Sequence, residues 1–300
     1  MRLFVFSYNR GPFLANCIDS IERLAPEHSL TVVDDASDDP ETLAVLARAA
    51  KHHTVVTGEA LSGHKHGGLY PNMQAAFDTV PDKALFCFLQ DDTQLVRPLT
   101  GEDEAALHRQ FDHAPTLGFI SPAFIRQISL KHAVDRDFRF DAALDLWFWH
   151  PQRRSTGAYY SDLLIARSDR LRAAGWRFES GESSNNQQAQ RHFMRMGRLR
   201  VPFAMWLPNG PAFRGKQKSW ALRFAERRRR CGLYPLQDLA ADVEADLHQG
   251  TPPALPVAER CLNARSQHRL PVPWTYDPMQ GQRWLKWMDR LATKRQRRRQ

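Results

Sequence analysis

The stretch Leu85-Phe86-Cys87-Phe88-Leu89-Gln90-Asp91-Asp92-Thr93-Gln94 decides the fold class of this chain. A short apolar run of this kind, with polar residues on both sides, is typical of a buried central strand. Two adjacent carboxylates, Asp91 and Asp92, follow the run at its C-terminal end. In open α/β sheets ligands bind at that edge, because the loops leaving the strands form a crevice there. By itself an Asp-Asp pair is also compatible with a solvated turn, and for an isolated pair that interpretation is the favoured one.

Two other predicted strands deliver polar residues to the same edge. Residues 3–6 are followed by Tyr8-Asn9-Arg10, and residues 30–33 are followed by Asp34-Asp35. The order of strand and helix patterns predicts an α/β fold with a mostly parallel sheet and helices on both faces. Right-handed crossovers place the C-terminal ends of parallel strands on one side of the sheet. Three polar turns at one edge therefore predict a binding site.

The later elements are predicted from local signals. Thr100 and Asp103 form a capping-box pattern that predicts a helix to about residue 113. A Gly- and His-rich loop is expected over residues 58–71, a helix over 185–196, and an edge strand over 199–202, where Pro202 argues against a central position. His64 and His66 in that loop are compatible with a phosphate contact or with a solvated loop.

Composition favours a globular enzyme-sized chain over a membrane-spanning one. The 300 residues are 42% hydrophobic and include eight Trp, but no apolar run is long enough to span a bilayer. The N-terminus lacks the pattern of a signal peptide, so a cytoplasmic location is expected. The four cysteines show no Cys-x-x-Cys spacing, which predicts reduced thiols without a zinc site.

The positive charge is concentrated at one end of the chain. Residues 1–212 hold 23 Lys and Arg against 25 Asp and Glu, whereas residues 213–300 hold 19 against 8. This asymmetry predicts a near-neutral domain over 1–212 and a helical, basic C-terminal extension over 213–300. Helices are expected over residues 216–230 and 236–247, and a further helix carries Trp284, Trp287 and Leu291 on one face. That face fits a peripheral contact with an anionic membrane or a packed helix, and nucleic acid is the less favoured partner.

Several motifs together resemble the family 2 glycosyltransferases, which have the GT-A fold. Phe6-Ser7-Tyr8-Asn9-Arg10 looks like the opening strand and loop of that family, and Val32-Val33-Asp34-Asp35-Ala36-Ser37-Asp38 is similar to its Val-Asp-Asp-Gly-Ser-x-Asp signature. Gln90-Asp91-Asp92 stands where its Asp-x-Asp belongs, and Asn72 fits the Asn that opens the preceding helix. The resemblance covers roughly residues 1–205. It implies transfer of a sugar from a nucleotide-diphosphate donor, with a UDP-sugar as the first expectation.

The resemblance also implies roles for individual residues. Tyr8, Asn9, Arg10 and Asp34 would hold the base and ribose, and Asp35 would hold them or orient the loop. Asp92 would bind the Mg or Mn ion that neutralises the diphosphate. The sequence departs from the family pattern at Gln90, which replaces the first Asp, so that Asp91 or Gln90 must take over any ribose contact.

An inverting transfer also needs a base that deprotonates the acceptor hydroxyl. The family supplies a carboxylate at the start of a helix, but the corresponding positions here are Asn185 and Asn186. Glu182, at the mouth of the same helix, is the predicted base. It is equally compatible with a carboxylate that only complements the helix dipole, in which case Asp162 is the alternative base.

The sequence thus predicts a metal-dependent, inverting glycosyltransferase that acts on a glycan or lipid-linked acceptor. Family habit points to bacterial surface polysaccharide synthesis, with the enzyme at the inner face of the membrane. The alternative is a non-catalytic relative that binds a sugar nucleotide or glycan, which would explain the missing carboxylate pair. A nucleotidyltransferase is disfavoured because residues 7–12 make a poor Gly-rich basic loop.

Overall fold

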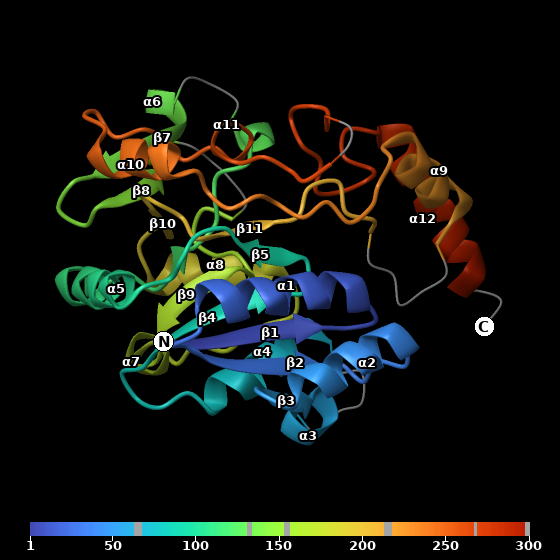
Figure 1. Cartoon of the computed structure of the whole chain (residues 1–300), viewed down its shortest axis with the longest axis horizontal. Coiled ribbons are helices and arrows are strands. Elements are labelled where there is room, and N and C mark those ends of the chain that lie inside the picture. The colour runs from blue at the N-terminus through green and yellow to red at the C-terminus, as the bar shows by residue number, and fades with distance from the viewer. Residues whose placement is uncertain (63–67, 131–133, 153–156, 213–217, 267–268, 298–300) are drawn as a thin grey trace.

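The structure is a computed structural model that describes residues 1–62, 68–130, 134–152, 157–212, 218–266 and 269–297. A mixed, mostly parallel central sheet has the strand order β3-β2-β1-β4-β9-β6-β10-β8-β7 and carries helices on both faces (Figure 1). The predicted α/β fold class is confirmed. His64 and His66 lie outside the described residues.

Four parallel strands form the first half of the sheet. They are β1 (Arg2–Ser7), β2 (Ser29–Asp34), β3 (Thr54–Thr57) and β4 (Leu85–Gln90). The register pairs Ser7 with Asp34 and Phe6 with Gln90, so β1, β2 and β4 end at the same level. The predicted meeting of three polar turns at one sheet edge is therefore confirmed.

The second half of the sheet mixes directions. Its strands are β6 (Ile120–Ser121), β7 (Phe138–Asp141), β8 (Leu146–Trp149), β9 (Leu164–Arg167) and β10 (Gly197–Leu199). The strand β9 runs antiparallel to β4, and β10 runs antiparallel to β8. The predicted edge strand over 199–202 is wrong, because β10 lies between β6 and β8. Pro202, which argued for an edge, falls beyond the paired residues and costs no ladder hydrogen bond.

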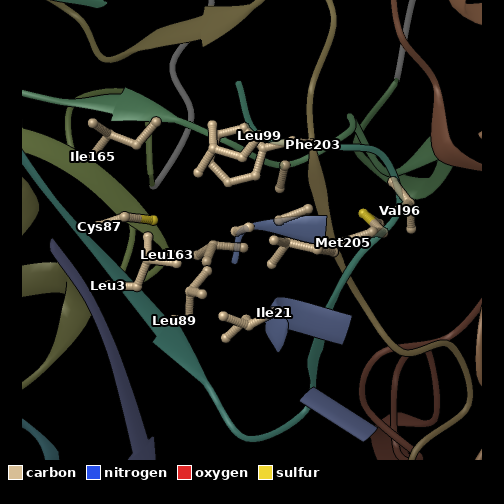
Figure 2. Packing of buried hydrophobic residues seen from close by; sticks show 14 of the residues in the cluster. Leu3, Ile21, Cys87, Leu89, Val96, Leu99, Leu163, Ile165, Phe203 and Met205 are labelled. Atoms are coloured by element: carbon tan, nitrogen blue, oxygen red, sulfur yellow. The ribbon is translucent and has the colours of Figure 1, made fainter. Parts of the chain in front are cut away.

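Alternate residues of the strands feed two hydrophobic layers. Leu3 and Val5 face a layer that includes α1 and α2, whereas Phe4 and Phe6 face the layer that includes α4 and α8. Figure 2 shows part of the first layer, where Leu3, Cys87 and Leu89 of the sheet meet Ile21 of α1 and Met205. The helices of the first layer are α1 (Gly11–Leu24), α2 (Pro40–Ala49) and α5 (Gly101–His113). Those of the second are α4 (Leu69–Asp78), α7 (Ser168–Ala173) and α8 (Glu182–His192).

Helix boundaries follow local capping. The capping box of Thr100 and Asp103 is present at the start of α5, as predicted. A short helix, α3 (Gly58–Ser62), occupies part of the predicted loop. The helix predicted over 185–196 begins three residues earlier and ends at His192, because the buried Asn185 lies inside its first turn and hydrogen-bonds the chain before it. Short helical segments also occur at η1 (Gln127–Ser129) and α6 (Val134–Asp137).

The C-terminal segment packs against the sheet domain. Its helices are α9 (Trp220–Arg228), α10 (Ala241–Gln249), α11 (Ala258–Cys261) and α12 (Arg283–Arg297). Leu236, Leu247 and Trp274 are buried in the same hydrophobic layer as α1, and α9 lies beside α12 at one end of the molecule (Figure 1). The helix predicted from residue 236 begins only at Ala241, because Leu236 is extended and bridges to Ala264. Within the described ranges, no helix is long and apolar enough to cross a membrane.

Candidate active site at the carboxyl edge of the sheet

The Asp91-Asp92 turn is held firmly between two small sheets. It joins β4 to β5 (Thr93–Leu95), which pairs antiparallel with β11 (Ala204–Trp206). The Asp91 amide donates to the Phe6 carbonyl at 3.1 Å, and the Asp92 carbonyl accepts from the Leu207 amide at 2.8 Å. The two carboxylates therefore project from a turn whose backbone is tied on both sides.

Arg10, in the loop after β1, forms ion pairs with both carboxylates that follow β4. Its Nη1 donates to Asp91 Oδ1 at 3.1 Å and to Asp92 Oδ2 at 3.0 Å, and its guanidinium lies 4.3 Å from the centre of the Phe13 ring. One cation thus offsets the repulsion between two adjacent carboxylates. No sequence pattern indicated the contact between Arg10 and Phe13.

The two carboxylates differ in environment. Burial raises the pKa of Asp91 to about 7, Arg10 opposes that shift, and the Asp92 charge reinforces it. The Asp92 side chain is 28% exposed, yet its Oδ1 atom is buried and has no hydrogen-bond partner in the described part of the chain. A buried carboxylate oxygen without a donor is costly unless a cation or a hydrogen bond reaches it.

Asn9 and Asp34 shape the loops around the site. Asn9 has a positive φ of 48°, and its Oδ1 accepts from the Asp38 and Asp39 amides at 2.9 and 3.0 Å. Both carboxylate oxygens of the buried Asp34 accept from Ser37, at 2.7 Å from the amide and 2.6 Å from the hydroxyl. These contacts pin the loop after β1 to the loop after β2.

Asp35 and Asn72 form a second tie at the same edge. Asp35 Oδ1 accepts from the Gly68 amide at 3.1 Å and from Asn72 Nδ2 at 3.0 Å. Asn72 is buried, and its Oδ1 has no hydrogen-bond partner among the residues that the structure describes. A Cβ at Gly58 would lie 2.5 Å from that oxygen, so a larger residue there would force the Asn72 side chain to shift.

Tyr8 and Gln90 complete the set of residues predicted at the edge. Gln90 is the half-buried last residue of β4, and its carbonyl accepts from the Thr93 hydroxyl at 2.6 Å. Tyr8 is half-buried directly after β1, and its backbone amide faces the Asp91 carboxylate. All of the predicted donor-site residues thus lie at one edge. The side-chain oxygens of Asn9 and Asp34, however, accept hydrogen bonds from the loop after β2.

A cavity of about 140 Å³ adjoins this edge. Trp206 is part of its wall, and the next residue, Leu207, is the one that contacts the Asp92 carbonyl. Glu182, the exposed first residue of α8, also lines the cavity. The remaining lining residues are Phe124, Ile125, Arg126, Ser129, Trp149, Gly157, Ser161 and Arg198.

Two arginines give this cavity a positive wall that the sequence did not reveal. Arg126 lies 5.2 Å from the Trp206 ring, and Arg198 lies 5.7 Å from the Trp149 ring. Burial and the neighbouring Arg126 lower the pKa of Arg198 to about 10, while Glu182 opposes the shift. No pattern marked these residues, because they come from segments that are distant in sequence.

Asp162 lies close to Glu182 but does not line the cavity. Its Oδ2 accepts from the Tyr70 hydroxyl at 3.1 Å, and burial followed by the Glu182 charge raises its pKa to about 6. The two asparagines at the expected base positions serve the backbone. Asn185 Nδ2 donates to the Glu179 carbonyl at 2.6 Å, and Asn186 Oδ1 accepts from the Tyr159 amide at 3.0 Å.

No group of three or more His, Cys, Asp or Glu side chains with metal-site geometry occurs among the described residues. The four cysteines are free thiols, and Cys17 and Cys87 are buried. A divalent ion at this edge would therefore need ligands beyond the protein. This is the usual arrangement for Mg²⁺, which combines one or two carboxylates with substrate phosphates and water.

No family model matches the sequence, and no curated protein sequence matches it. Solved structures do match. GalNAc-T7 with UDP, GalNAc and Mn²⁺ superposes with a TM-score of 0.52 at 12% identity, over 76% of this chain and 47% of that one. The 1-349 fragment of S. aureus TarS in complex with UDP has a TM-score of 0.48 at 15% identity, over 68% of this chain. The mannosyltransferase PcManGT from Pyrobaculum calidifontis, with GDP-Man and Mn²⁺, has a TM-score of 0.47 at 16% identity.

This chain spans 59% of the TarS fragment and 47% of the GalNAc-T7 chain. At these identities the comparison establishes the fold alone. The strand order, the polar edge where three strands end and the superposition agree: the chain has a GT-A-like α/β fold.

Proposed function

We propose that this chain is a metal-dependent, inverting glycosyltransferase that uses a nucleotide-diphosphate sugar, with UDP-sugar as the first donor to test. Two observations carry the proposal together. The buried Oδ1 atom of Asp92 has no hydrogen-bond partner among the described residues, and Glu182 lines a cavity whose wall also includes Trp206, the neighbour of the Leu207 that contacts the Asp92 carbonyl. A cation next to Asp92 and a hydroxyl next to Glu182 would complete the two halves of a glycosyl-transfer site.

The side chains at the edge fit Mg²⁺ or Mn²⁺ bound together with a diphosphate. Asp92 offers a carboxylate oxygen that lacks a donor, and the diphosphate would supply further oxygen ligands. Such an ion stabilises the negative charge of the departing nucleotide diphosphate. Arg10, which now spans both carboxylates, lies where it can also contact a phosphate.

The donor nucleotide is assigned to the loops after β1 and β2. In this proposal Tyr8 stacks on the base, while Arg10 and Asp91 or Gln90 reach the ribose and phosphates. Asn9, Asp34, Asp35 and Asn72 hold those loops in position through the contacts described above. Apart from the Oδ1 atom of Asn72, the polar atoms in those contacts are engaged within the protein, so we assign these residues support of the loops ahead of direct contact with the base.

Glu182 is the proposed base for the acceptor hydroxyl. It lines the cavity next to Trp206, whereas Asp162 accepts a hydrogen bond from Tyr70 and does not line the cavity. We assign Asp162 the role of orienting Tyr70.

The acceptor is proposed to be a glycan or a lipid-linked glycan, which would suit bacterial surface polysaccharide synthesis at the inner face of the membrane. The competing proposal is a non-catalytic relative that binds a sugar nucleotide. Asn185 and Asn186 at the positions of the usual carboxylates favour that alternative. Donor binding without any slow donor hydrolysis in the presence of Mn²⁺ would distinguish it.

The test is a thermal-shift screen of nucleotide sugars with and without Mn²⁺, on the wild type and on Asp92→Asn. One donor should stabilise the wild type by about 3 kcal/mol at roughly one hundred times its Kd, and only when Mn²⁺ is present. Asp92→Asn should lose the Mn²⁺-dependent part. Asp39→Asn is a matched control at the same edge, because the Asp39 carboxylate caps α2 and accepts from the Thr42 amide and hydroxyl. The proposal fails if no donor stabilises the wild type or if both variants respond alike.

A further inference from the structure

A larger cavity, of about 650 Å³, lies in the C-terminal extension beside the end of α9. Its wall is strongly basic, and no Asp or Glu is among the described residues that line it. The charged residues of the wall are Arg228, Arg229, Arg230 and Arg269. A concave surface with four guanidinium groups is a candidate site for an anionic ligand.

The arginines of this cavity have no neutralising carboxylate among the described residues. In the part of the chain that the structure describes, none of the four forms an ion pair with a carboxylate. Carboxylates of the same extension are already engaged: Glu226 contacts Lys218 at 2.8 Å, and Asp277 contacts Lys286 at 2.9 Å. Four positive charges around one hollow repel each other, and a bound anion would relieve that repulsion.

Capping of α9 does not account for this cluster. Basic side chains at a helix end often serve the last carbonyl groups. Here backbone amides already serve the last carbonyls of α9: Ala225 accepts from the Arg229 amide at 3.0 Å, Arg227 from the Arg230 amide at 3.1 Å, and Glu226 from the Cys231 amide at 2.9 Å. Arg229 donates to the Gln280 carbonyl, and its buried Nε has no partner among the described residues.

Asn209 makes the floor of the cavity rigid. It is 3% exposed and adopts a positive φ of 51°. Its amide donates to the Thr275 carbonyl at 2.7 Å, and its carbonyl accepts from the Gly232 amide at 3.1 Å. Its Oδ1 accepts from the Thr275 amide and hydroxyl at 3.1 and 2.9 Å. Segments distant in sequence are thereby fixed around the cavity before any ligand arrives.

The cavity borders the edge of the sheet through one short segment. Leu207 contacts the Asp92 carbonyl, and Asn209, two residues later, lines the cavity. Two residues span at most about 7 Å between Cα atoms. A Cβ at Gly210 would lie 3.7 Å from Arg10 Nη2. A ligand in this cavity would therefore lie next to the proposed donor site.

We infer that this cavity binds a phosphate group. The assignment of that phosphate to the acceptor rests on the glycosyltransferase function proposed above. Guanidinium groups bind phosphate oxygens through paired, charge-assisted hydrogen bonds. The side chain of Trp284 on the rim is 53% exposed and offers an apolar face to a sugar ring. The ligand class is thus a phosphorylated glycan, with the phosphate among the arginines and the sugar toward Trp284.

The test is calorimetric titration of the full-length chain in EDTA with sodium pyrophosphate, with glucose 6-phosphate and with glucose. The cavity variant is the triple substitution Arg228→Gln, Arg230→Gln and Arg269→Gln, which replaces the exposed arginines and spares the half-buried Arg229. The control variant removes the same charge from exposed arginines of α9 and α12 outside the cavity, with Arg223→Gln, Arg227→Gln and Arg290→Gln. EDTA keeps the metal-dependent donor site out of the measurement.

Pyrophosphate and glucose 6-phosphate should bind the wild type and the control variant with equal affinity. They should bind the cavity variant at least about tenfold more weakly, because the paired hydrogen bonds from guanidinium groups are lost. Glucose alone should not bind. Equal weakening in both variants would overturn the inference in favour of general electrostatic attraction. Displacement of pyrophosphate by UDP in EDTA would overturn it in favour of the donor diphosphate. Sedimentation with vesicles of equimolar phosphatidylcholine and phosphatidylglycerol distinguishes a glycan phosphate from a lipid phosphate as the ligand. Vesicle binding that is lost only in the cavity variant would identify a lipid phosphate and overturn the glycan assignment. Failure of the nucleotide-sugar screen would leave phosphate binding intact and remove only its link to the acceptor.

Discussion

At the scale of single residues, substitutions of Glu182 and Asp162 are expected to have different effects on kcat. Glu182→Gln should lower kcat by about 10²- to 10⁴-fold, because a general base contributes roughly that much, while donor affinity stays unchanged. Asp162→Asn should keep most of kcat, since Asp162 does not line the cavity. Measurements of transfer rate and donor affinity on both variants check this. A larger loss of kcat in Asp162→Asn than in Glu182→Gln would reverse the assignment.

Asp162 also makes a prediction about stability and pH. Burial raises its pKa from 3.8 to about 6, so between these values the folded chain keeps a proton that the unfolded chain has released. The free energy of unfolding contributed by this group therefore falls as pH rises through that window, and the loss is complete above it. Asp162→Asn should stabilise the protein by about 1–3 kcal/mol at pH 7.5 and by much less near pH 4. Urea unfolding at the two pH values measures the difference, and equal effects would contradict it.

At the scale of elements, the loops after β1 and β2 depend on Asn9. Its side chain accepts two backbone hydrogen bonds and donates to Asp38 Oδ1 at 2.6 Å. Asn9→Gly keeps the positive φ accessible but removes these contacts. We expect a loss of about 1–3 kcal/mol in the free energy of unfolding and weaker donor binding. Asn16→Ala, which loses a single contact with Gln94, is the comparison variant, and an equal loss there would contradict the role of Asn9.

At the scale of the whole molecule, the extension completes the hydrophobic core. Leu236, Leu247 and Trp274 are buried against the sheet domain, and Gln94 Nε2 donates to the Leu236 carbonyl at 2.8 Å. Burying each such side chain contributes about 1.5–3 kcal/mol. Truncation after residue 212 should therefore give a chain that aggregates or lacks a cooperative unfolding transition by circular dichroism. Removal of residues 292–300 alone should leave the melting temperature almost unchanged.

The sequence by itself determined the α/β class, the common edge of β1, β2 and β4, and the residues that meet there. Those features follow from apolar runs that end in polar residues and from the handedness of crossovers, which are local or general properties of the chain. The resemblance to the family 2 glycosyltransferases pointed to the GT-A fold, because its motifs are also local sequence patterns. The edge strand over 199–202 was mispredicted, because Pro202 was read without knowing which residues pair.

Only the tertiary structure decided what these residues contact. It joined Arg10 to both carboxylates, left Asp92 Oδ1 without a partner among the described residues, and paired both oxygens of Asp34 with Ser37. It also formed the two cavities from segments far apart in sequence, so that Arg198 and Arg229 carry no sequence signal of their positions. Such contacts arise from packing between distant segments, where burial and charge depend on neighbours that no local pattern specifies.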